Sequence, residues 1–418
     1  MTNKISTLKQ AILLLTSHFS KSDNNGFSPL TNTEWKKFAL WLHEHNLTPE
    51  HLLINDPKEM LANWHDPKIT LERITALLNR GHSLALALEK WQRAGIWIIT
   101  RSDAEYPQRL KQHLKASSPP VLFGCGNPQL LNIGGLAVVG SRNASPEDLL
   151  YTENIGKKAA SEQIAIVSGG ARGVDETAML SAISHQGVTI GIMADSLLRA
   201  VTSQKWRQGL MNNRCVLISP FYPEAGFNSG NAMARNRYIY CLSDACLVVH
   251  SGKKGGTWSG AEENLRHQWV PLWVKLNNDV NSANGDLLKK GGLLFNENWS
   301  LKQIIETKIT NDESQLGLFA PLDETSNEEP HTPEHLEMLN TETAIESYNT
   351  TSTPYNIDFY KMFLKELPKL TQDAITLENL IKRTNLSKSQ LNEWLKLALE
   401  KGVIRKLAKP VRYISASH

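Results

Sequence analysis

The sequence has few cysteines, and their spacing excludes two common ways of stabilising a fold. Only four are present in 418 residues, at positions 125, 215, 241 and 246. They form no Cys-x-x-Cys pair and have no histidine at zinc-ligand spacing, so neither a disulfide framework nor a structural metal is predicted. Cys215, Cys241 and Cys246 fall in or beside predicted core strands, where a cysteine is usually a small buried hydrophobe. These features predict a reduced, cytoplasmic protein.

Long apolar runs are also missing. No stretch of 18 residues is apolar enough to cross a membrane. The apolar residues 13–15 are crowded by Lys9, Gln10 and Ser17 and precede no small-residue cleavage site, so they do not make a convincing signal peptide. The sequence has no nucleophile–histidine pair, Walker lysine motif or metal-ligand cluster, which argues against a nuclease or an ATPase. We therefore expect no membrane partner, no metal and no cofactor.

Lysine and arginine are absent from one long segment. Residues 311–356 hold ten acidic residues, no Lys or Arg, and many Thr, Ser, Asn and Pro residues without helical or strand periodicity. The chain has a formal net charge of +3, so removing the −10 of this segment leaves +13 on the rest. We predict a disordered acidic linker and a basic remainder that binds a polyanion, for whose surface the linker could compete.

Six short apolar runs dominate the middle of the chain, and they break into glycines, serines and basic residues. They span residues 136–140, 164–168, 188–193, 215–219, 245–250 and 270–274. Helix-compatible segments separate most of them, and strands alternating with helices indicate right-handed crossovers and a parallel sheet. Continuous apolar runs suit strands that are buried on both faces. The prediction is an α/β fold.

The segments after three of these strands combine glycines with basic side chains. An open parallel sheet binds ligands at the carboxyl ends of its strands, where glycines let backbone N–H groups converge on an anion. The candidate phosphate-binding residues are Gly140, Ser141, Arg142, Ser168, Gly169, Gly170, Arg172, Gly173, Lys253 and Lys254. Alternatively, the glycines only serve tight turns. That alternative is at least as good for any one loop, but three such loops together favour a phosphate site.

The remaining segments predict the domain organisation. Residues 1–115 form a helical, SAM-like N-terminal domain, because apolar residues recur at helical spacing. Residues 116–310 hold the sheet, 311–356 the acidic linker and 357–418 a basic winged helix of three helices and a hairpin. Ser387 and Gly402 are its candidate helix caps. Whether this domain contacts DNA or docks a protein stays open.

Three motifs in the predicted core occur in a specific order and spacing. They are Val-Gly-Ser-Arg at 139–142, Ser-Gly-Gly-Ala-Arg-Gly-Val-Asp at 168–175 and Arg-Asn-Arg at 235–237. Together they resemble the DNA-processing protein A (DprA/Smf) family. The resemblance implies a Rossmann-like protein that binds single-stranded DNA, forms a homodimer and helps to load a RecA-type recombinase in natural transformation. It also implies that loops carrying Arg235, Asn236 and Arg237 line the DNA pocket together with the glycine-rich loops.

The sequence also departs from the family pattern. Met179 stands where the family usually has a histidine, residues 194–198 replace a Gly-Leu-Asp…Tyr-Pro element, and residues 272–275 replace an expected Pro-Gly. These changes gather on the predicted ligand rim. They suggest a divergent branch, whose process could be transformation, DNA repair or defence against foreign DNA.

One loop partly resembles nucleotide phosphoribohydrolases, in which a Gly-Gly…Gly-Thr loop precedes a catalytic glutamate. Here Glu262 and Glu263 follow a Gly-Gly-Thr, and a carboxylate beside a phosphate cradle could stabilise an oxocarbenium-like transition state or activate water. The spacing differs, and we instead expect both glutamates in the first turns of a helix, where they favour the positive end of its dipole. We predict a non-enzymatic single-strand DNA-binding protein, with a nucleotide hydrolase as the alternative.

Overall fold

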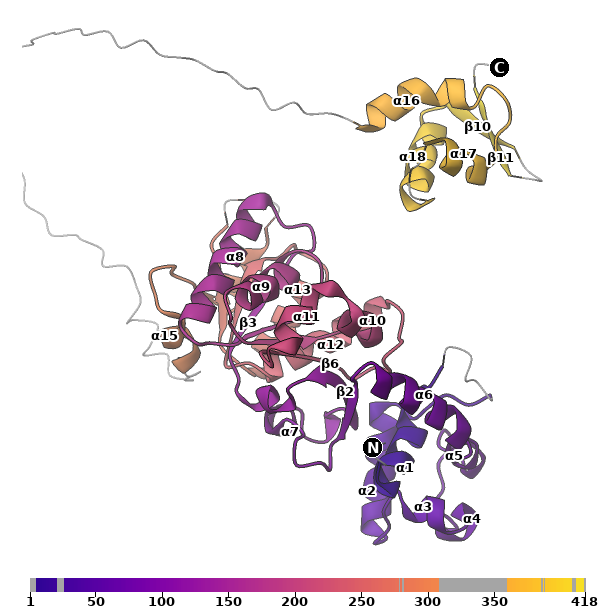
Figure 1. The fold of residues 1–418 in the computed structure, drawn as a ribbon, viewed down its shortest axis with the longest axis vertical. Helices are drawn as coiled ribbons and strands as arrows, with labels where there is room; N and C mark the ends of the chain where they lie inside the picture. The colour runs from indigo at the N-terminus through magenta and orange to yellow at the C-terminus, as the bar shows by residue number, and fades with distance from the viewer. Residues whose placement is uncertain are drawn as a thin grey trace, which may run out of the picture. The chain divides into compact units, whose positions relative to one another are not determined.

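The computed structural model describes residues 5–20, 26–277, 279, 282–307, 359–384, 386, 388–407 and 411–416 (Figure 1). The chain forms two compact units, Met1–Leu322 and Asp323–His418. The predicted acidic linker at 311–356, the predicted cap Ser387 and the predicted hairpin tip at 408–410 lie outside the described residues. Among the helices in the described ranges, none is long and apolar enough to span a membrane.

A sheet of nine strands, counted over the described residues, forms the core of the first unit. The strands are β1 (Trp97–Thr100), β2 (Val121–Gly126), β3 (Leu136–Gly140), β4 (Ile166–Ser168), β5 (Thr189–Ile192), β6 (Cys215–Ser219), β7 (Ala245–His250), β8 (Leu272–Val274) and β9 (Leu293–Leu294). Their order is β1-β2-β6-β5-β4-β3-β7-β8-β9. Every pairing from β6 to β9 is parallel, whereas β1 and β2 form an antiparallel edge. The six predicted strands and their parallel arrangement are confirmed.

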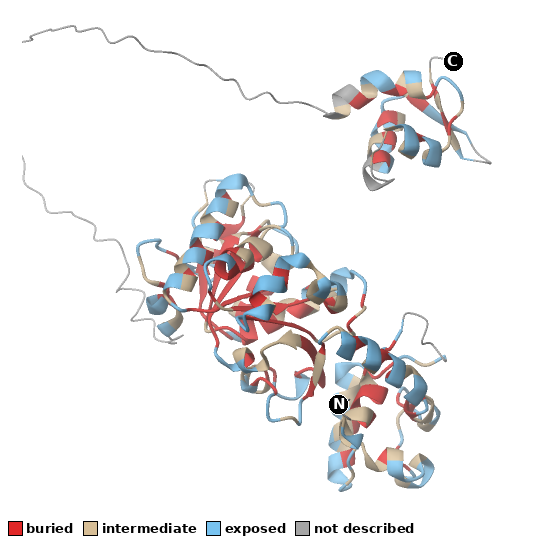
Figure 2. Ribbon diagram, viewed as in Figure 1, coloured by how far each residue is buried: buried red, intermediate tan, exposed pale blue. Residues whose placement is uncertain are grey.

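Helices cover both faces of this sheet, whose strands are the buried layer drawn in red in Figure 2. The elements are α7 (Gln108–Leu114), η1 (Lys115–Ser117), η2 (Pro128–Asn132), α8 (Pro146–Ser161), α9 (Val174–Ser184), α10 (Leu197–Thr202), α11 (Gln204–Met211), α12 (Ser229–Cys241), α13 (Gly256–His267), α14 (Asn284–Lys289) and α15 (Leu301–Glu306). Side chains alternate along a strand, so Leu136 and Val138 pack with α8 and α9, whereas Ala137 and Val139 pack with α12 and α13. Burial on both faces explains the continuous apolar runs.

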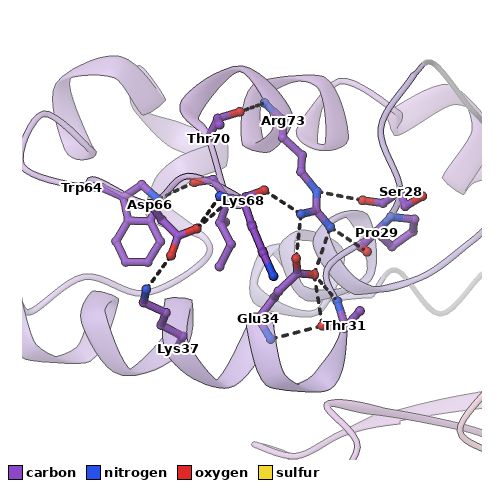
Figure 3. A network of polar contacts seen from close by, with 11 residues as sticks. Ser28, Pro29, Thr31, Glu34, Lys37, Trp64, Asp66, Lys68, Thr70 and Arg73 are labelled. Atoms are coloured by element: carbon purple, nitrogen blue, oxygen red, sulfur yellow. Dashed lines mark hydrogen bonds and ion pairs between the residues drawn. The ribbon is translucent and has the colours of Figure 1, made fainter.

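Short helices precede the sheet: α1 (Thr7–Thr16), α2 (Asn32–Glu44), α3 (His51–Ile54), α4 (Pro57–Met60), α5 (Leu71–Leu78) and α6 (Gly81–Arg93). A polar network joins α2 to α5 (Figure 3). The Arg73 guanidinium donates to both carboxylate oxygens of Glu34, at 2.9 and 3.0 Å, and to the carbonyl oxygens of Ser28 and Pro29. Glu34 also accepts from the backbone N–H of the helix cap Thr31. The hydrogen bond from Arg73, above all, lowers the pKa of Glu34 to about 2.

These helices pack directly against the sheet. The ring of Trp91 in α6 meets Phe123 of β2 edge-on, with centroids 5.1 Å apart, and the helical core is continuous with the apolar cluster on the α8–α9 face. Lys90 forms a 2.5 Å ion pair with Glu224, in the loop between β6 and α12. Strand β1 lies within residues 1–115 and forms the antiparallel edge of the sheet. The predicted boundaries at 115, 310 and 356 stay predictions.

The second unit contains three helices followed by a β-hairpin. Its elements are α16 (Phe359–Leu370), α17 (Leu377–Thr384), α18 (Lys388–Glu400), β10 (Ile404–Leu407) and β11 (Arg412–Ser415). Phe363, Leu380, Leu395 and Tyr413 are buried in its small apolar core. The order of elements matches the expected one, and the winged-helix assignment stays a prediction.

The cysteines behave as small hydrophobic residues. All four are free thiols, and Cys215, Cys241 and Cys246 are buried as predicted. Burial raises the pKa of the Cys215 thiol to about 12. A protonated, enclosed thiol is chemically inert, so these cysteines contribute packing rather than reactivity.

Candidate nucleic-acid interface

A cavity of about 410 Å³, here called the first cavity, opens at the carboxyl ends of β3 and β7. Its walls come from the loop after β3, the start of α9, helix α12 and the loop between β7 and α13. The predicted site residues that line it are Gly140, Ser141, Arg142, Arg235, Asn236 and Lys254. Its position is the one where open parallel sheets bind their ligands.

Hydrogen bonds between the surrounding elements hold the first cavity in shape. The Thr257 hydroxyl, at the start of α13, donates to the carbonyl oxygen of Gly140 at 3.0 Å. The side-chain amide of Asn236 donates to the carbonyl oxygen of Gly256 at 2.8 Å. The loop after β3 and helix α12 are therefore both fastened to the start of α13.

A buried ion pair forms part of the cavity wall. Arg235 on α12 is only 3% exposed, and its Nη1 lies 3.6 Å from Oδ2 of Asp175 in the first turn of α9. Burial raises the pKa of the Asp175 carboxyl and lowers that of the Arg235 guanidinium, and their mutual attraction opposes both shifts. The backbone amides of Gly140 and Gly169 also interact with the Asp175 carboxylate and oppose the rise of its pKa. These two amides, predicted to bind a ligand's phosphate, thus serve the protein's own carboxylate.

Two glycines of the second motif are required by close contacts. A Cβ on Gly169 would lie 1.2 Å from Nη1 of Arg235, so only glycine leaves room for the buried guanidinium. Gly173 has a φ of +92°, and a Cβ there would lie 2.4 Å from the carbonyl oxygen of Ser141. The N–H of Val174 donates to that same oxygen at 3.3 Å. The interpretation of glycines as packing and turn residues describes these two positions well.

The exposed rim of the first cavity carries positive charge and an aromatic ring. Arg142, Lys253 and Lys254, here called the rim cations, are exposed and form no ion pair within the described part of the chain. The Arg142 guanidinium carbon lies 5.1 Å from the ring centroid of Phe227, whose side chain is 62% exposed. Such a rim offers a nucleic acid both phosphate-binding groups and a flat apolar surface.

Some predicted residues lie away from the first cavity. Ser168 is buried, and its hydroxyl donates to the carbonyl oxygen of Val138 at 2.6 Å, so it serves the sheet interior. Gly170 lies beside Met193 in the adjoining loop. Arg172 is exposed, and its Nη2 donates to Oδ1 of Asn143 at 2.7 Å. Of these three residues, only Arg172 presents a charge to solvent near the rim.

The prediction that residues 235–237 lie on a loop is wrong, because they belong to α12. The helix begins after Asn228, whose side chain accepts from the N–H of Gly230 at 2.7 Å, and no proline interrupts the sequence that follows. Arg235 is buried by this helix, while Arg237 pairs with Glu263 at 2.9 Å. Neither arginine projects freely into solvent.

The two glutamates that motivated the hydrolase alternative are both in ion pairs. Glu262 pairs with Lys290 at 3.0 Å, and Glu263 pairs with Arg237. Both lie in the middle of α13, so the prediction that they occupy its first turns is wrong; the helix already begins at Gly256, directly after the glycine loop. Neither lines the first cavity. Among the described residues, no cluster of three or more histidine, cysteine or acidic side chains could hold a metal ion.

Sequence reasoning missed three residues that shape this site. Phe227 and Met233 line the first cavity with exposed side chains, and Asp175 supplies its buried charge. An aromatic residue between Gly226 and Asn228, in a polar loop, is a usable signal for an exposed ring. The role of Asp175 was not visible, because its partner arginine comes from a distant helix.

An α/β protein with a basic cavity at the carboxyl edge of a parallel sheet has the architecture in which open parallel sheets bind their ligands. A model of the family described as DNA recombination-mediator protein A matches residues 97–306, about half of the sequence. The chain belongs to that family.

Individual relatives agree with this assignment. The chain is 29% identical over 184 residues to the DNA processing protein DprA of Bacillus subtilis, covering 44% of this chain and 61% of that protein. It is 27% identical over 262 residues to protein Smf of Synechocystis, covering 57% and 63%. It thus spans less than two thirds of these curated relatives. The structure of DprA from Streptococcus pneumoniae has the same fold, with a TM-score of 0.54 and 20% identity over 70% of this chain and 95% of that one.

Proposed function

We propose that this protein binds single-stranded DNA at the first cavity and acts as a non-enzymatic mediator of DNA recombination. One observation carries the proposal: Arg142 and Lys254 line the first cavity, Lys253 adjoins Lys254 in the chain, all three are free of ion pairs within the described residues, and Arg142 lies beside the exposed ring of Phe227. The phosphates of a strand pair with such cations. Its unpaired bases stack on flat apolar side chains, which a duplex cannot use because its bases are already stacked.

The size of the first cavity and the contacts between its walls support this proposal. A volume of about 410 Å³ falls within the range of small-ligand pockets, so it suits a nucleotide rather than a double helix. The buried Asp175–Arg235 pair and the hydrogen bonds from Thr257 and Asn236 hold the walls before any ligand arrives. A wall that needs no rearrangement binds more tightly for the same contacts.

Membership of the recombination-mediator family supports a role in DNA recombination. On the same family resemblance, we include a Rossmann-like core, a homodimer, a RecA-type recombinase as partner and a C-terminal winged helix in the proposal. The process could be transformation, repair or defence. The surroundings of Glu262 and Glu263 favour the non-enzymatic assignment over a nucleotide hydrolase, because each carboxylate already has a cation as partner and neither residue lines the first cavity.

The salt dependence of DNA binding tests the proposal. We would measure the affinity for a labelled single strand by fluorescence anisotropy at several salt concentrations. Replacing all three rim cations with alanine should lower the log–log slope by roughly 0.7 for each lost phosphate contact, or about 2 in total. A duplex of the same sequence should bind more weakly than the single strand.

A matched control variant removes three positive charges from surfaces outside the first cavity. Lys36, Lys157 and Lys302 are exposed lysines on α2, α8 and α15, and none of them lines the first cavity. Their triple alanine variant should keep the wild-type slope. An equal loss of slope in both variants would mean that diffuse charge attracts the DNA, and the assignment to the first cavity would fall.

A further inference from the structure

A second cavity, of about 340 Å³, lies in the groove between α12 and α13. Its walls are Met233, Ala234 and Arg237 from α12, and Gly256, Ser259, Gly260, Glu263 and Arg266 from α13. Met233 and Gly256 also line the first cavity. The two cavities are therefore neighbours that share a wall, and a ligand longer than one nucleotide can continue from the first into the second.

Small side chains give the second cavity an accessible floor. Ala234, Gly256, Ser259 and Gly260 present nothing larger than a hydroxymethyl group. A Cβ on Gly260 would lie 3.2 Å from the hydroxyl oxygen of Tyr240, so glycine lets α13 pack closely on α12. A flat ring can therefore approach the helix backbone. The exposed side chain of Met233, at the shared wall, offers a polarisable sulfur for contact with that ring.

The charges of the second cavity differ from those of the first. Nη2 of Arg237 lies 2.9 Å from Oε1 of Glu263, so the arginine is neutralised within the cavity wall. The other carboxylate oxygen, Oε2, accepts no hydrogen bond from the described residues, and Nε of Arg237 likewise has no partner among them. A carboxylate repels phosphate, whereas it is a strong acceptor for an amino group. Arg266, the other cation of the lining, is exposed and has no ion pair among the described residues, so it can take a phosphate while the carboxylate of Glu263 suits a base edge.

We propose that the second cavity binds a nucleobase of the same DNA strand, and that Glu263 accepts a hydrogen bond from the exocyclic amino group of that base. This inference rests on the proposed single-strand binding. Cytosine, adenine and guanine carry such an amino group, whereas thymine and uracil present a carbonyl oxygen that the carboxylate repels. The site therefore confers a base preference on a protein whose other contacts are to phosphates and ring faces.

The experiment compares oligonucleotides of deoxycytidine and of deoxyuridine, of equal length, at neutral pH. These homopolymers place the same base in the cavity in every register, and their bases differ only at the hydrogen-bonding edge. We expect the wild-type chain to bind the deoxycytidine strand about 5- to 10-fold more tightly, the effect of one charged hydrogen bond to a base. Equal affinity of the wild type for both strands would overturn the proposal without using any variant.

Two matched variants locate the preference. Glu263→Gln should reduce the ratio of affinities to about one, because an amide both donates and accepts. Glu262→Gln removes the same charge from the same helix, but Glu262 pairs with Lys290 and does not line the cavity, so the ratio should persist. A ratio that survives Glu263→Gln, or that disappears in both variants, contradicts the inference. Failure to bind either strand would instead refute the proposed function, and this inference with it.

Discussion

Replacing Arg235 with alanine should destabilise the fold rather than remove a DNA contact. The guanidinium is 3% exposed and lies 3.6 Å from the carboxylate of Asp175, which is itself buried. Breaking a buried pair by removing one partner costs about 3–5 kcal/mol, because the other charge stays buried without compensation. Asp175 keeps the favourable effect of the backbone amides of Gly140 and Gly169, so we expect the lower end, about 3 kcal/mol.

Urea unfolding at neutral pH, followed by tryptophan fluorescence, measures this loss. The deficit relative to wild type should shrink as the pH falls, because burial raises the pKa of Asp175 and the protonated acid needs no counter-ion. The sign follows from linkage: a folded state that binds the extra proton is stabilised by acid. A double variant, Asp175→Asn with Arg235→Gln, should recover part of the stability, since neither uncompensated charge remains.

Arg142→Ala is the contrasting variant. Its side chain is exposed and forms no ion pair within the described residues, so its unfolding free energy should change by less than about 0.5 kcal/mol. Its DNA binding should instead lose roughly 0.7 in salt slope. Were Arg235→Ala to unfold like wild type while losing that same slope, Arg235 would be a phosphate ligand and the buried-pair interpretation would be wrong.

Two further predictions concern the rim and the N-terminal helices. Phe227→Ala should weaken single-strand binding about 10-fold without changing the salt slope, because stacking on one base is worth about 1–3 kcal/mol. Phe227→Tyr should bind like wild type, because it keeps the ring. Unchanged affinity of the alanine variant would exclude stacking. Because the pKa of Glu34 falls from 4.5 to about 2 on folding, its contribution is present above about pH 4.5 and is lost as the pH falls towards 2. Arg73→Ala should therefore cost about 1–3 kcal/mol at neutral pH and flatten the acid dependence of urea unfolding, whereas an unaltered pH profile would contradict the role of the network in Figure 3.

The sheet could be predicted from the sequence because its signals are local. Each strand is a continuous apolar run that ends in glycine, serine or a basic residue, and burial on both faces requires such a run. The rim cations could also be predicted, because the carboxyl ends of parallel strands meet at one edge. The same local patterns placed the three helices and the hairpin of the second unit.

The internal contacts of the site could not be predicted in the same way. Arg235 and Asp175 meet only when α12 packs beside the start of α9, and no local pattern encodes that meeting. The family resemblance placed Arg235 in the pocket without showing that its charge is already neutralised. The predicted positions of Glu262 and Glu263 in the helix were wrong for a simpler reason. The first turns of α13 contain glycines, so the sequence did not indicate that the helix already begins at Gly256.

The ion pairs divide the basic residues at the carboxyl edge of the sheet into two groups with different expected roles. Arg235 and Arg237 sit on one helix and are each paired with a carboxylate, so their charge fixes helices against one another. A phosphate gains little from a cation that must first leave its carboxylate, whereas a solvated cation exchanges only water and counter-ions. The rim cations lie on loops and remain free of ion pairs within the described chain. The number of phosphates bound should therefore follow the rim cations, and it should be smaller than the number of basic residues in the three motifs would suggest.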